Sequence, residues 1–319
     1  MPKTVLITGA SSGFGRDTAE TLASSGYRVF ASMRDPSGKN REAANSLWSQ
    51  AIDVVALDVT DDNSVQRAVQ AAIDKAGRID VLVNNAGIAS AGVTEAFTPS
   101  QAGMVFNTNV VGTLRTARAV LPGMRRDRDG LIINIGSILG RVTFPFFGLY
   151  GASKFAVEAL TESLRYEVSQ FGIDVVLVQP SAYPTCMYSS ALNPGDTDRA
   201  ASYGSVGDIP GALFQNFMTM FQSKNAPEPH DVAATLAAII EAPKGSRPPR
   251  TVVGEPFGAD AVNELAAPIQ QRVLDGLGLD RKVDRLRRAD GAKAGRRRKK
   301  YQSSHRLHVP ISPRSGEFE

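Results

Sequence analysis

The amino-acid sequence predicts an α/β fold in which helices cover both faces of one doubly wound, parallel β-sheet. Short runs of apolar, mostly β-branched residues alternate with segments of helical periodicity, and most of these runs are apolar at consecutive positions, as strands buried on both faces are. A glycine-rich loop separates the first run from the first helical segment. Alternation of this kind implies right-handed crossovers and therefore a parallel sheet.

Seven segments carry the strand pattern, at residues 3–8, 27–32, 53–58, 80–84, 131–136, 174–179 and 251–254. After Asp61 and Asp62, which suit a helix N-terminus, apolar residues recur every three or four positions. The same periodicity predicts two long helices, over residues 102–124 and 151–170. The chain of 319 residues can bury one large core, and we assign residues 1–280 to a single domain.

Residues 186–228 interrupt this alternation. The segment is rich in Ser, Asn, Pro and Gly, but it also carries apolar pairs such as Leu213 and Phe214. A long insertion with its own apolar residues, late in an α/β fold, is more often a lid over a substrate site than a linker. We therefore predict a substrate lid.

Charge is unevenly distributed along the chain, whose formal net charge is +4. Residues 281–300 hold eleven Lys and Arg against two Asp, a net of +9, and residues 301–319 are neutral. Residues 1–280 therefore carry a net charge of −5. The segment 281–319 has few apolar residues to bury, which predicts a basic, disordered tail that could bind nucleic acid or an anionic surface.

The remaining composition is that of an ordinary globular protein, with 42% hydrophobic and 21% charged residues. The single cysteine, Cys186, excludes an internal disulfide, and no signal-peptide pattern precedes the first strand, so a cytoplasmic location is expected. No run approaches the roughly 18 apolar residues of a membrane-spanning helix. No metal site is expected.

The loop after the first strand has the spacing G-x-x-x-G-x-G and opens a helix. Glycines allow a tight turn and let backbone N–H groups approach a pyrophosphate at the helix N-terminus. A plain tight turn explains some such clusters, but the position after the first strand favours a dinucleotide site in a Rossmann-type fold. The candidate binding residues are Gly9, Ser11, Ser12, Gly13, Phe14 and Gly15.

The end of the second strand indicates which dinucleotide binds. NAD-binding folds usually place a carboxylate there for the ribose 2′-hydroxyl, whereas here Met33 takes that position and Arg34 follows. A guanidinium suits a 2′-phosphate, so the sequence predicts NADP(H). The alternative is a solvated loop arginine paired with Asp35. After the third strand, Asp58 and Val59 are placed to meet the adenine, although Asp58 could equally cap the next segment.

The fourth strand ends in Asn84, Asn85, Ala86 and Gly87. Small residues at this point would let the backbone pass close to a cofactor, and a simple turn explains the run equally well. Together with the glycine loop, we assign Asn85, Ala86 and Gly87 to the cofactor site.

Tyr150 and Lys154 open a predicted helix four residues apart, and therefore lie on one face of it. A free tyrosine titrates near ~10, but a neighbouring ammonium and the positive nicotinamide of an oxidised cofactor favour phenolate, which would give an acid/base usable near neutral pH. Ser137 follows a strand at its carboxyl end, where open α/β sheets bind ligands. Asn109 lies inside a predicted helix, where asparagine is mildly unfavourable and needs a reason.

In this order and spacing, the motifs resemble those of the short-chain dehydrogenase/reductase family in its compact single-domain form. The likeness covers about residues 3–255. Ala-Ser-Met-Arg-Asp after the second strand and Ala-Ser-Lys-Phe-Ala at residues 152–156 are most similar to the branch that includes hydroxysteroid and retinol dehydrogenases. We expect a seven-stranded sheet in the order 3-2-1-4-5-6-7.

The resemblance also implies roles for single residues. Tyr150 would protonate the carbonyl oxygen as hydride arrives from the nicotinamide, and Ser137 would orient that oxygen. Lys154 would hold the nicotinamide ribose, bind the cofactor together with Tyr150 and lower the pKa of that tyrosine. Asn109 would hold a water in a proton relay to Lys154. In the family the two long helices pair across a two-fold axis, which implies a homodimer or homotetramer.

The segment after the sixth strand departs from the family pattern. The family usually has Pro-Gly there, with Thr four residues past the glycine; here Pro180 and Thr185 are in register as cofactor contacts, but Ser181 replaces the glycine. If that position needs positive φ, serine is strained there.

The leading functional prediction is NADP(H)-dependent interconversion of a ketone or aldehyde and an alcohol. An apolar substrate is predicted because several apolar side chains crowd the approach to Tyr150, although loop packing or an oligomer contact explains them about as well. These residues are Val142, Phe144, Phe146, Phe147 and Leu149. A non-catalytic NADP(H)-binding sensor with a polyanion-binding tail is the alternative, disfavoured by the intact Ser, Tyr and Lys. A sugar-nucleotide epimerase is disfavoured by the glycine spacing.

Overall fold

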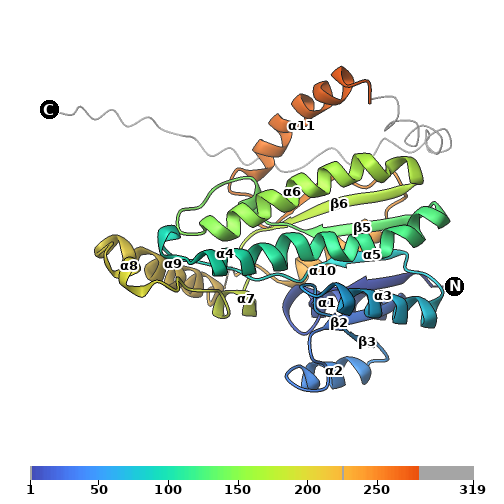
Figure 1. Ribbon diagram of the computed structural model, residues 1–319, viewed down its shortest axis with the longest axis horizontal. Helices are drawn as coiled ribbons and strands as arrows, with labels where there is room; N and C mark the ends of the chain where they lie inside the picture. Colours follow the sequence, from blue (N-terminus) through green and yellow to red (C-terminus); the bar gives the residue numbers. More distant parts are fainter. Residues whose placement is uncertain (1, 225, 280–319) are drawn as a thin grey trace.

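The computed structural model describes residues 2–224 and 226–279, and the predicted tail, residues 281–319, lies outside them. Seven strands form one sheet in the order β3-β2-β1-β4-β5-β6-β7, with every neighbouring pair parallel, which confirms the predicted fold and strand order (Figure 1). The strands are β1 Thr4–Ile7, β2 Arg28–Met33, β3 Asp53–Ala56, β4 Val81–Asn84, β5 Gly130–Ile135, β6 Ile173–Pro180 and β7 Arg250–Val253. Their ends differ from the predicted ones by at most two residues.

Helices cover both faces of the sheet because successive strand residues point to opposite sides. In β1, Val5 and Ile7 join one buried apolar cluster while Leu6 joins the other. The first cluster is closed by α1 Gly13–Ser24, α2 Arg41–Trp48 and α10 His230–Glu241, and the second by α3 Asp62–Ala76, α5 Gly112–Asp127 and α6 Gly148–Val168. α3 begins where the acidic pair predicts, since the Asp61 carboxylate accepts the Asn63 N–H at 2.8 Å.

The helix predicted over residues 102–124 is built from three pieces. α4 Pro99–Phe106 begins three residues earlier than predicted, at a capping box between Thr98 and Gln101. A π-helical turn, η2 Asn107–Val111, joins it to α5. The helix predicted over residues 151–170 is α6, which also begins three residues earlier.

The insertion at residues 186–228 contains helices that its composition did not predict. They are α7 Cys186–Ser189, α8 Thr197–Ala201 and α9 Ser205–Phe221, and they project at one end of the molecule (Figure 1). Phe217 of α9 makes edge contacts with Phe147, with ring centroids 6.4 Å apart, and lies 5.6 Å from the ring of Tyr188. These aromatic contacts order a segment that is rich in Ser, Asn, Pro and Gly.

The remaining short elements are η1 Thr94–Ala96, η3 Ile138–Gly140 and η4 Ser169–Phe171, and the long helix α11 Ala259–Gly276 follows β7. Across residues 2–224 and 226–279, every helix falls short of the length and apolar character that crossing a membrane requires.

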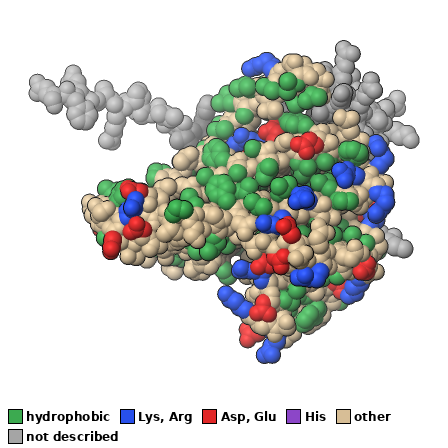
Figure 2. Space-filling model, viewed as in Figure 1, with side chains coloured by type: hydrophobic (Ala, Val, Ile, Leu, Met, Phe, Trp, Pro, Cys, Tyr) green, Lys and Arg blue, Asp and Glu red, His purple; other side chains and the backbone are tan. Residues whose placement is uncertain are grey.

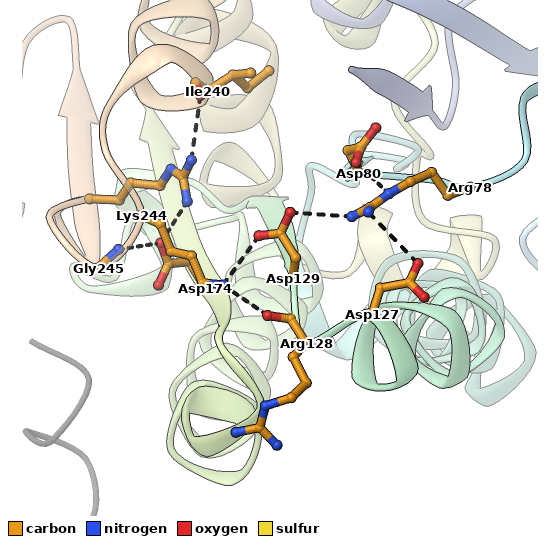
Figure 3. Close-up of polar contacts among 10 residues, drawn as sticks. Arg78, Asp80, Asp127, Arg128, Asp129, Asp174, Ile240, Lys244 and Gly245 are labelled. Carbon is orange, nitrogen blue, oxygen red and sulfur yellow. Dashed lines mark hydrogen bonds and ion pairs between the residues drawn. The ribbon is translucent and has the colours of Figure 1, made fainter. Parts of the chain in front are cut away.

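A polar network ties together the amino ends of the central strands (Figure 3). Arg78 pairs with Asp80, which precedes β4, at 2.7 Å and with Asp129, which precedes β5, at 3.2 Å. Lys244 reaches Asp129 from the other side, also at 3.2 Å. These ion pairs are partly exposed, so each contributes modestly to stability. The network lies at the amino-end edge of the sheet. The predicted site residues lie at the opposite edge, where the strands have their carboxyl ends.

Candidate active site

The three glycines of the first loop are each required by the local geometry. Gly9 has φ +68°, and a Cβ there would lie 2.8 Å from the Cα of Ala86. A Cβ on Gly15 would lie 2.5 Å from the carbonyl oxygen of Gly9. Gly13 has φ +54° and opens toward Thr185, whose Cβ would be 3.8 Å away. The loop is thus pressed against the end of β4 on one side and left open on the other.

The open side suits a pyrophosphate. α1 begins at Gly13, its N-cap Ser12 makes no side-chain hydrogen bond to the first turn, and that turn carries no acidic residue. Its N–H groups and the positive end of the helix dipole therefore remain for an anion. Asn85 fixes the loop, because its side-chain amide donates to the carbonyls of Thr8 and Gly9 at 2.9 and 3.0 Å. The residues present fit a dinucleotide.

Arg34 lies exposed directly after β2. The alternative pairing with Asp35 is not formed among the described residues, because Asp35 accepts the Lys39 N–H at 2.8 Å instead. Arg34 is close enough to Asp58 to influence it: burial raises the pKa of Asp58, but hydrogen bonds from Thr60 and the charge of Arg34 outweigh burial and lower it. The guanidinium thus stands where β2 and β3 end.

Asp58 and Val59 form the turn after β3. The Asp58 carboxylate accepts the N–H and hydroxyl of Thr60 at 2.8 and 2.7 Å, so it stabilises this turn and does not cap α3. Val59 is buried against α5, where a Cβ on Gly112 would approach its side chain to 2.9 Å. The turn is therefore rigid beside the predicted adenine position.

Tyr150 and Lys154 lie on one face of α6, as their spacing predicts. The Lys154 ammonium is 5.5 Å from the centroid of the Tyr150 ring and donates to the carbonyl oxygen of Ile135, at the end of β5, at 2.8 Å. Ser137 follows that strand, and its hydroxyl acts to lower the pKa of Tyr150. The structure therefore brings Ser137, Tyr150 and Lys154 together at the carboxyl edge of the sheet.

The predicted lowering of the Tyr150 pKa relies on the nicotinamide of a bound cofactor as well as on Lys154, and in the cofactor-free protein burial acts against it. Burial raises the pKa of Tyr150 to about 12, and the hydrogen bond with Ser137 opposes this only in part. Burial also lowers the pKa of Lys154 to about 8. Desolvation is thus the main cause of the pKa shift of both groups. The spacing of the two residues could not indicate this, because it does not report how deeply they are buried.

The buried ammonium predicts that the free energy of unfolding of the cofactor-free protein rises with pH between pH 8 and pH 10. The folded pKa of Lys154 is about 8, against 10.5 in the unfolded chain, so the unfolded chain binds more protons in this window and a higher pH favours folding. The site contributes up to ~1.4 kcal/mol per pH unit. Above pH 10 the raised pKa values of buried tyrosines act in the opposite sense.

Urea unfolding at several pH values between 8 and 10 measures this slope. Lys154→Met should lack this rise of the free energy of unfolding with pH. The quantity to compare is the slope of the free energy of unfolding against pH in the two proteins, because the substitution also changes the absolute stability. Parallel pH profiles for the two proteins would show that Lys154 is not desolvated in this way.

The hydrogen bonds of the Asn109 side chain explain why an asparagine occupies this position inside a helix. It lies in the π-helical turn η2, and its side-chain amide pairs with the backbone N–H and carbonyl of Ile88, both at 2.9 Å. The same amide donates to the Ser153 hydroxyl at 3.0 Å, and Ser153 donates to the carbonyl of Tyr150 at 2.7 Å. Asn109 therefore joins the segment after β4, beside Gly87, to the start of α6.

The sequence analysis missed a buried charge network that lies further along α6 from Tyr150 and Lys154. Glu158 is 4% exposed and accepts hydrogen bonds from Arg250 at 2.8 Å and Gln179, and it pairs with Arg141 at 3.0 Å. Arg250 also donates to Glu162 at 2.6 Å. A signal was present, because Tyr150, Lys154, Glu158 and Glu162 repeat at four-residue spacing on α6.

A pocket opens in front of Ser137, Tyr150 and Lys154, and its wall is mostly apolar. Of the five apolar residues predicted to approach Tyr150, only Phe144 and Phe147 line it; Val142, Phe146 and Leu149 do not. Other segments also line it, among them the predicted lid at residues 186–228. The sequence analysis missed those outside that range, because their proximity depends on the tertiary fold. Further lining residues include Tyr183, Met187, Tyr188, Phe214, Phe217 and Phe257.

The segment after β6 is unstrained at the position where the family glycine is replaced. Positive φ among the described non-glycine residues occurs elsewhere, so Ser181 carries no such strain, and its N–H donates to Val253 of β7 at 2.9 Å. Pro180 and Thr185 both line the pocket, and Thr185 faces Gly13 of the glycine loop.

The fold is that of a dinucleotide-binding oxidoreductase, and Ser137, Tyr150 and Lys154 lie together at the carboxyl edge of its sheet. Residues 3–194 match the short chain dehydrogenase family, and the chain belongs to it. It is 38% identical over 260 residues to a 3-ketodihydrosphingosine reductase of Bacteroides thetaiotaomicron, covering 79% of this chain and 88% of that protein. It is 36% identical over 262 residues to retinol dehydrogenase 8 of Bos taurus, covering 78% and 80%.

Solved structures show the same fold. An actinorhodin polyketide ketoreductase with NADPH superposes with a TM-score of 0.67 at 26% identity, covering 81% of this chain and 97% of that one. A short chain dehydrogenase/reductase from Burkholderia phymatum in complex with NAD gives 0.68 at 27% identity, covering 85% and 95%. This chain is thus an oxidoreductase of the alcohol–carbonyl type that uses a nicotinamide dinucleotide.

Proposed function

We propose that the protein reduces an apolar ketone or aldehyde to the alcohol, or catalyses the reverse reaction, with NADP(H). The observation that carries this proposal is the set Ser137, Tyr150 and Lys154 lining a pocket whose wall is mostly apolar. The dinucleotide, when bound, supplies or accepts the hydride. The side chains of this chain then have to hold the substrate oxygen and exchange one proton with it.

The Tyr150 hydroxyl is the proton donor in the direction of reduction. It lines the same pocket as Ser137, whose hydroxyl oxygen accepts the Leu139 N–H at 3.1 Å and is thereby fixed in direction. Both hydroxyls can donate to one carbonyl oxygen, which favours developing negative charge on that oxygen. Lys154 is held under the tyrosine ring by Ile135, where its charge and that of an oxidised nicotinamide would lower the raised pKa of Tyr150.

The cofactor site is proposed to extend from the glycine loop through Arg34, Asp58 and Val59 to Asn85, Ala86 and Gly87. Exposure of Arg34 at the end of β2, free of the Asp35 carboxylate, supports the preference for the 2′-phosphate of NADP(H). Relatives in this family with NADPH and with NAD are both known, so this preference rests on Arg34.

Arg34→Ala should weaken NADPH binding by about 1.5–3 kcal/mol, which is roughly 10- to 150-fold in Kd, because a charge-assisted hydrogen bond to phosphate is lost. NADH binding should change little, since its ribose offers no phosphate to the guanidinium. Fluorescence titration of both cofactors measures the two dissociation constants. A loss of the same size for NADH and NADPH, or no loss for either, would remove Arg34 from the 2′-phosphate site.

Residues 186–228 are proposed to form the lid of the pocket. Met187, Tyr188, Phe214 and Phe217 all line it from this segment, and the Tyr150 hydroxyl lies 3.9 Å from the Met187 sulfur. Ordering of the lid would exclude water from the reacting carbonyl.

The protein is proposed to form a homodimer or homotetramer through α4, α5 and α6. Large apolar side chains are exposed on these elements, and Figure 2 shows green side chains gathered over this part of the surface. They are Met104, Val111, Leu114 and Phe155. Exposed apolar patches of this kind mark association sites.

A spectrophotometric assay of NADPH oxidation against steroid, retinoid and small ketones tests the reaction. Turnover of an apolar carbonyl, faster with NADPH than with NADH, is the expected result. Tight NADPH binding without turnover of any carbonyl in the panel would favour the sensor, which retains the cofactor site without catalysis.

A further inference from the structure

The turn that follows β2 holds an acidic side chain in a backbone conformation that is uncommon outside glycine. Asp35, the residue after Arg34, has φ +45°, in the left-handed region. Its carboxylate accepts the backbone N–H of Lys39 at 2.8 Å, and its carbonyl oxygen accepts the N–H of Asn40 at 3.1 Å. Aspartate tolerates this conformation because its short side chain forms such local hydrogen bonds. The turn therefore fixes the direction in which the Asp35 carboxylate points.

Gly38 packs directly against this carboxylate. A Cβ at residue 38 would lie 2.7 Å from Oδ1 and 2.8 Å from Cγ of Asp35, so only glycine leaves room for the carboxylate in this position. The φ of Gly38 lies outside the positive range, so other residues can adopt its backbone conformation. A methyl group at residue 38 would therefore displace the Asp35 carboxylate without straining the backbone.

Two carboxylates lie near Arg34, and local hydrogen bonds hold both of them. The Asp58 carboxylate accepts the N–H and hydroxyl of Thr60, at 2.8 and 2.7 Å. The Asp35 carboxylate is directed at the Lys39 N–H. Within residues 2–224 and 226–279, neither carboxylate forms an ion pair with Arg34, which is exposed. The guanidinium is therefore left to an anion from outside the chain.

We propose that this turn determines cofactor specificity by withholding the Asp35 carboxylate from Arg34. The inference rests on the proposed function, because it takes Arg34 as the group that binds the 2′-phosphate of NADP(H). A carboxylate free to pair with Arg34 would compete with that phosphate, and it would also repel the roughly two negative charges that a phosphate carries. NADH has no such phosphate, so its binding would not change. Asp35 is thus a positioning residue that acts through Arg34.

The turn does not serve α2 as a cap. Asn40 is the N-cap residue of α2, but its side chain makes no capping hydrogen bond and instead donates to the carbonyl oxygen of Arg34. The Asp35 carboxylate likewise binds Lys39, before α2 begins at Arg41. Side chains that commonly stabilise a helix N-terminus here hold the segment next to Arg34, as a role in cofactor binding requires.

Titration of four full-length proteins with NADPH and with NADH tests the proposal. They are the parent, Gly38→Ala, Asp35→Asn and the double variant. In Gly38→Ala the displaced carboxylate should raise the Kd for NADPH by about threefold to tenfold, the effect of an exposed charge on a charge-assisted contact, and leave that for NADH unchanged. This loss should shrink as salt is raised, because exposed charges are screened.

The two Asn variants separate the charge from the shape of the turn. Asp35→Asn keeps an oxygen for the Lys39 N–H and tolerates positive φ, so NADPH should bind at least as tightly as to the parent. In the double variant the displaced group is an uncharged amide, so the loss seen in Gly38→Ala should disappear. A purely structural role for the turn predicts no such rescue.

Gly276→Ala is the matched control. Gly276 also has φ outside the positive range, a Cβ there meets no atom within 4 Å, and Figure 1 shows α11 far from β2. This variant should bind both cofactors as the parent does. The melting temperature of each protein shows that it is folded.

Equal losses for NADPH and NADH in Gly38→Ala, or a loss that the double variant retains, would overturn the proposal and leave the turn a structural role. Unchanged affinity of Gly38→Ala for both cofactors would also overturn it. If Arg34→Ala selectively loses NADPH while Gly38→Ala does not, only this inference fails. If Arg34→Ala shows no selective loss, the proposed 2′-phosphate site fails and this inference fails with it.

Discussion

Replacing Tyr150 with Phe is expected to lower kcat by roughly 10²- to 10⁴-fold, the range that a positioned proton donor contributes. The ring remains above the Lys154 ammonium, whose hydrogen bond to Ile135 does not involve Tyr150, so the cofactor affinity should be unchanged. Only the hydroxyl that is shared with Ser137 is lost. Steady-state kinetics with a carbonyl substrate and a separate titration of NADPH measure the two effects.

Tyr188→Phe is the control for this experiment. Tyr188 lines the same pocket, and burial raises its pKa strongly, with the neighbouring Tyr150 adding to the shift. Removing its hydroxyl changes the pocket by the same single atom but leaves the proposed proton donor in place, so kcat should remain within a few-fold of the parent. Near-normal turnover in Tyr150→Phe, or an equal loss in both variants, would refute the assignment of the donor.

Replacing Glu158 with Gln is expected to lower the free energy of unfolding by about 3–5 kcal/mol. The carboxylate is 4% exposed and lies between Arg141 and Arg250, and an uncharged amide would leave two partly buried guanidinium groups without their shared counter-charge. Turnover should fall as well, because Arg141 follows η3 and its contact with α6 holds the segment that begins at Ser137.

Urea unfolding measures the stability of this variant, and Glu167→Gln is the matched control on the same helix. Glu167 is exposed and accepts a hydrogen bond from Ser163 at 2.7 Å, so its replacement should cost no more than about 0.5 kcal/mol. A free energy of unfolding for Glu158→Gln equal to that of this control would show that the buried charge network does not stabilise the fold.

Much of this fold and site could be predicted because it depends on local pattern. The sheet order, the glycine loop and the four-residue spacing of Tyr150 and Lys154 follow from short-range sequence features together with the family resemblance. The π-helical turn at Asn109 could not be predicted, because the hydrogen bonds that favour it come from Ile88 and Ser153, which are distant in the sequence. A helical pattern is compatible with either geometry.

The effect of burial on the pKa of Tyr150 and the full set of residues that line the pocket could not be predicted from the sequence, for a related reason. Whether burial or a neighbouring charge dominates depends on how tightly several segments close around the hydroxyl, and spacing along one helix carries no such information. Val142 and Leu149 are apolar like the residues that line the pocket, yet the pocket is completed by α9 and by Phe257, which lie more than fifty residues further along the chain.

The repeat of Tyr150, Lys154, Glu158 and Glu162 along α6 has a consequence for substitutions. One helix carries both the residues proposed to react, Tyr150 and Lys154, and the buried charges that anchor it, so a change on α6 would act on activity and on stability together. The apolar wall from residues 187–217 belongs to a different stretch of chain, with no part in that anchorage. Replacements in this wall would therefore reshape the pocket without touching the buried charges on α6.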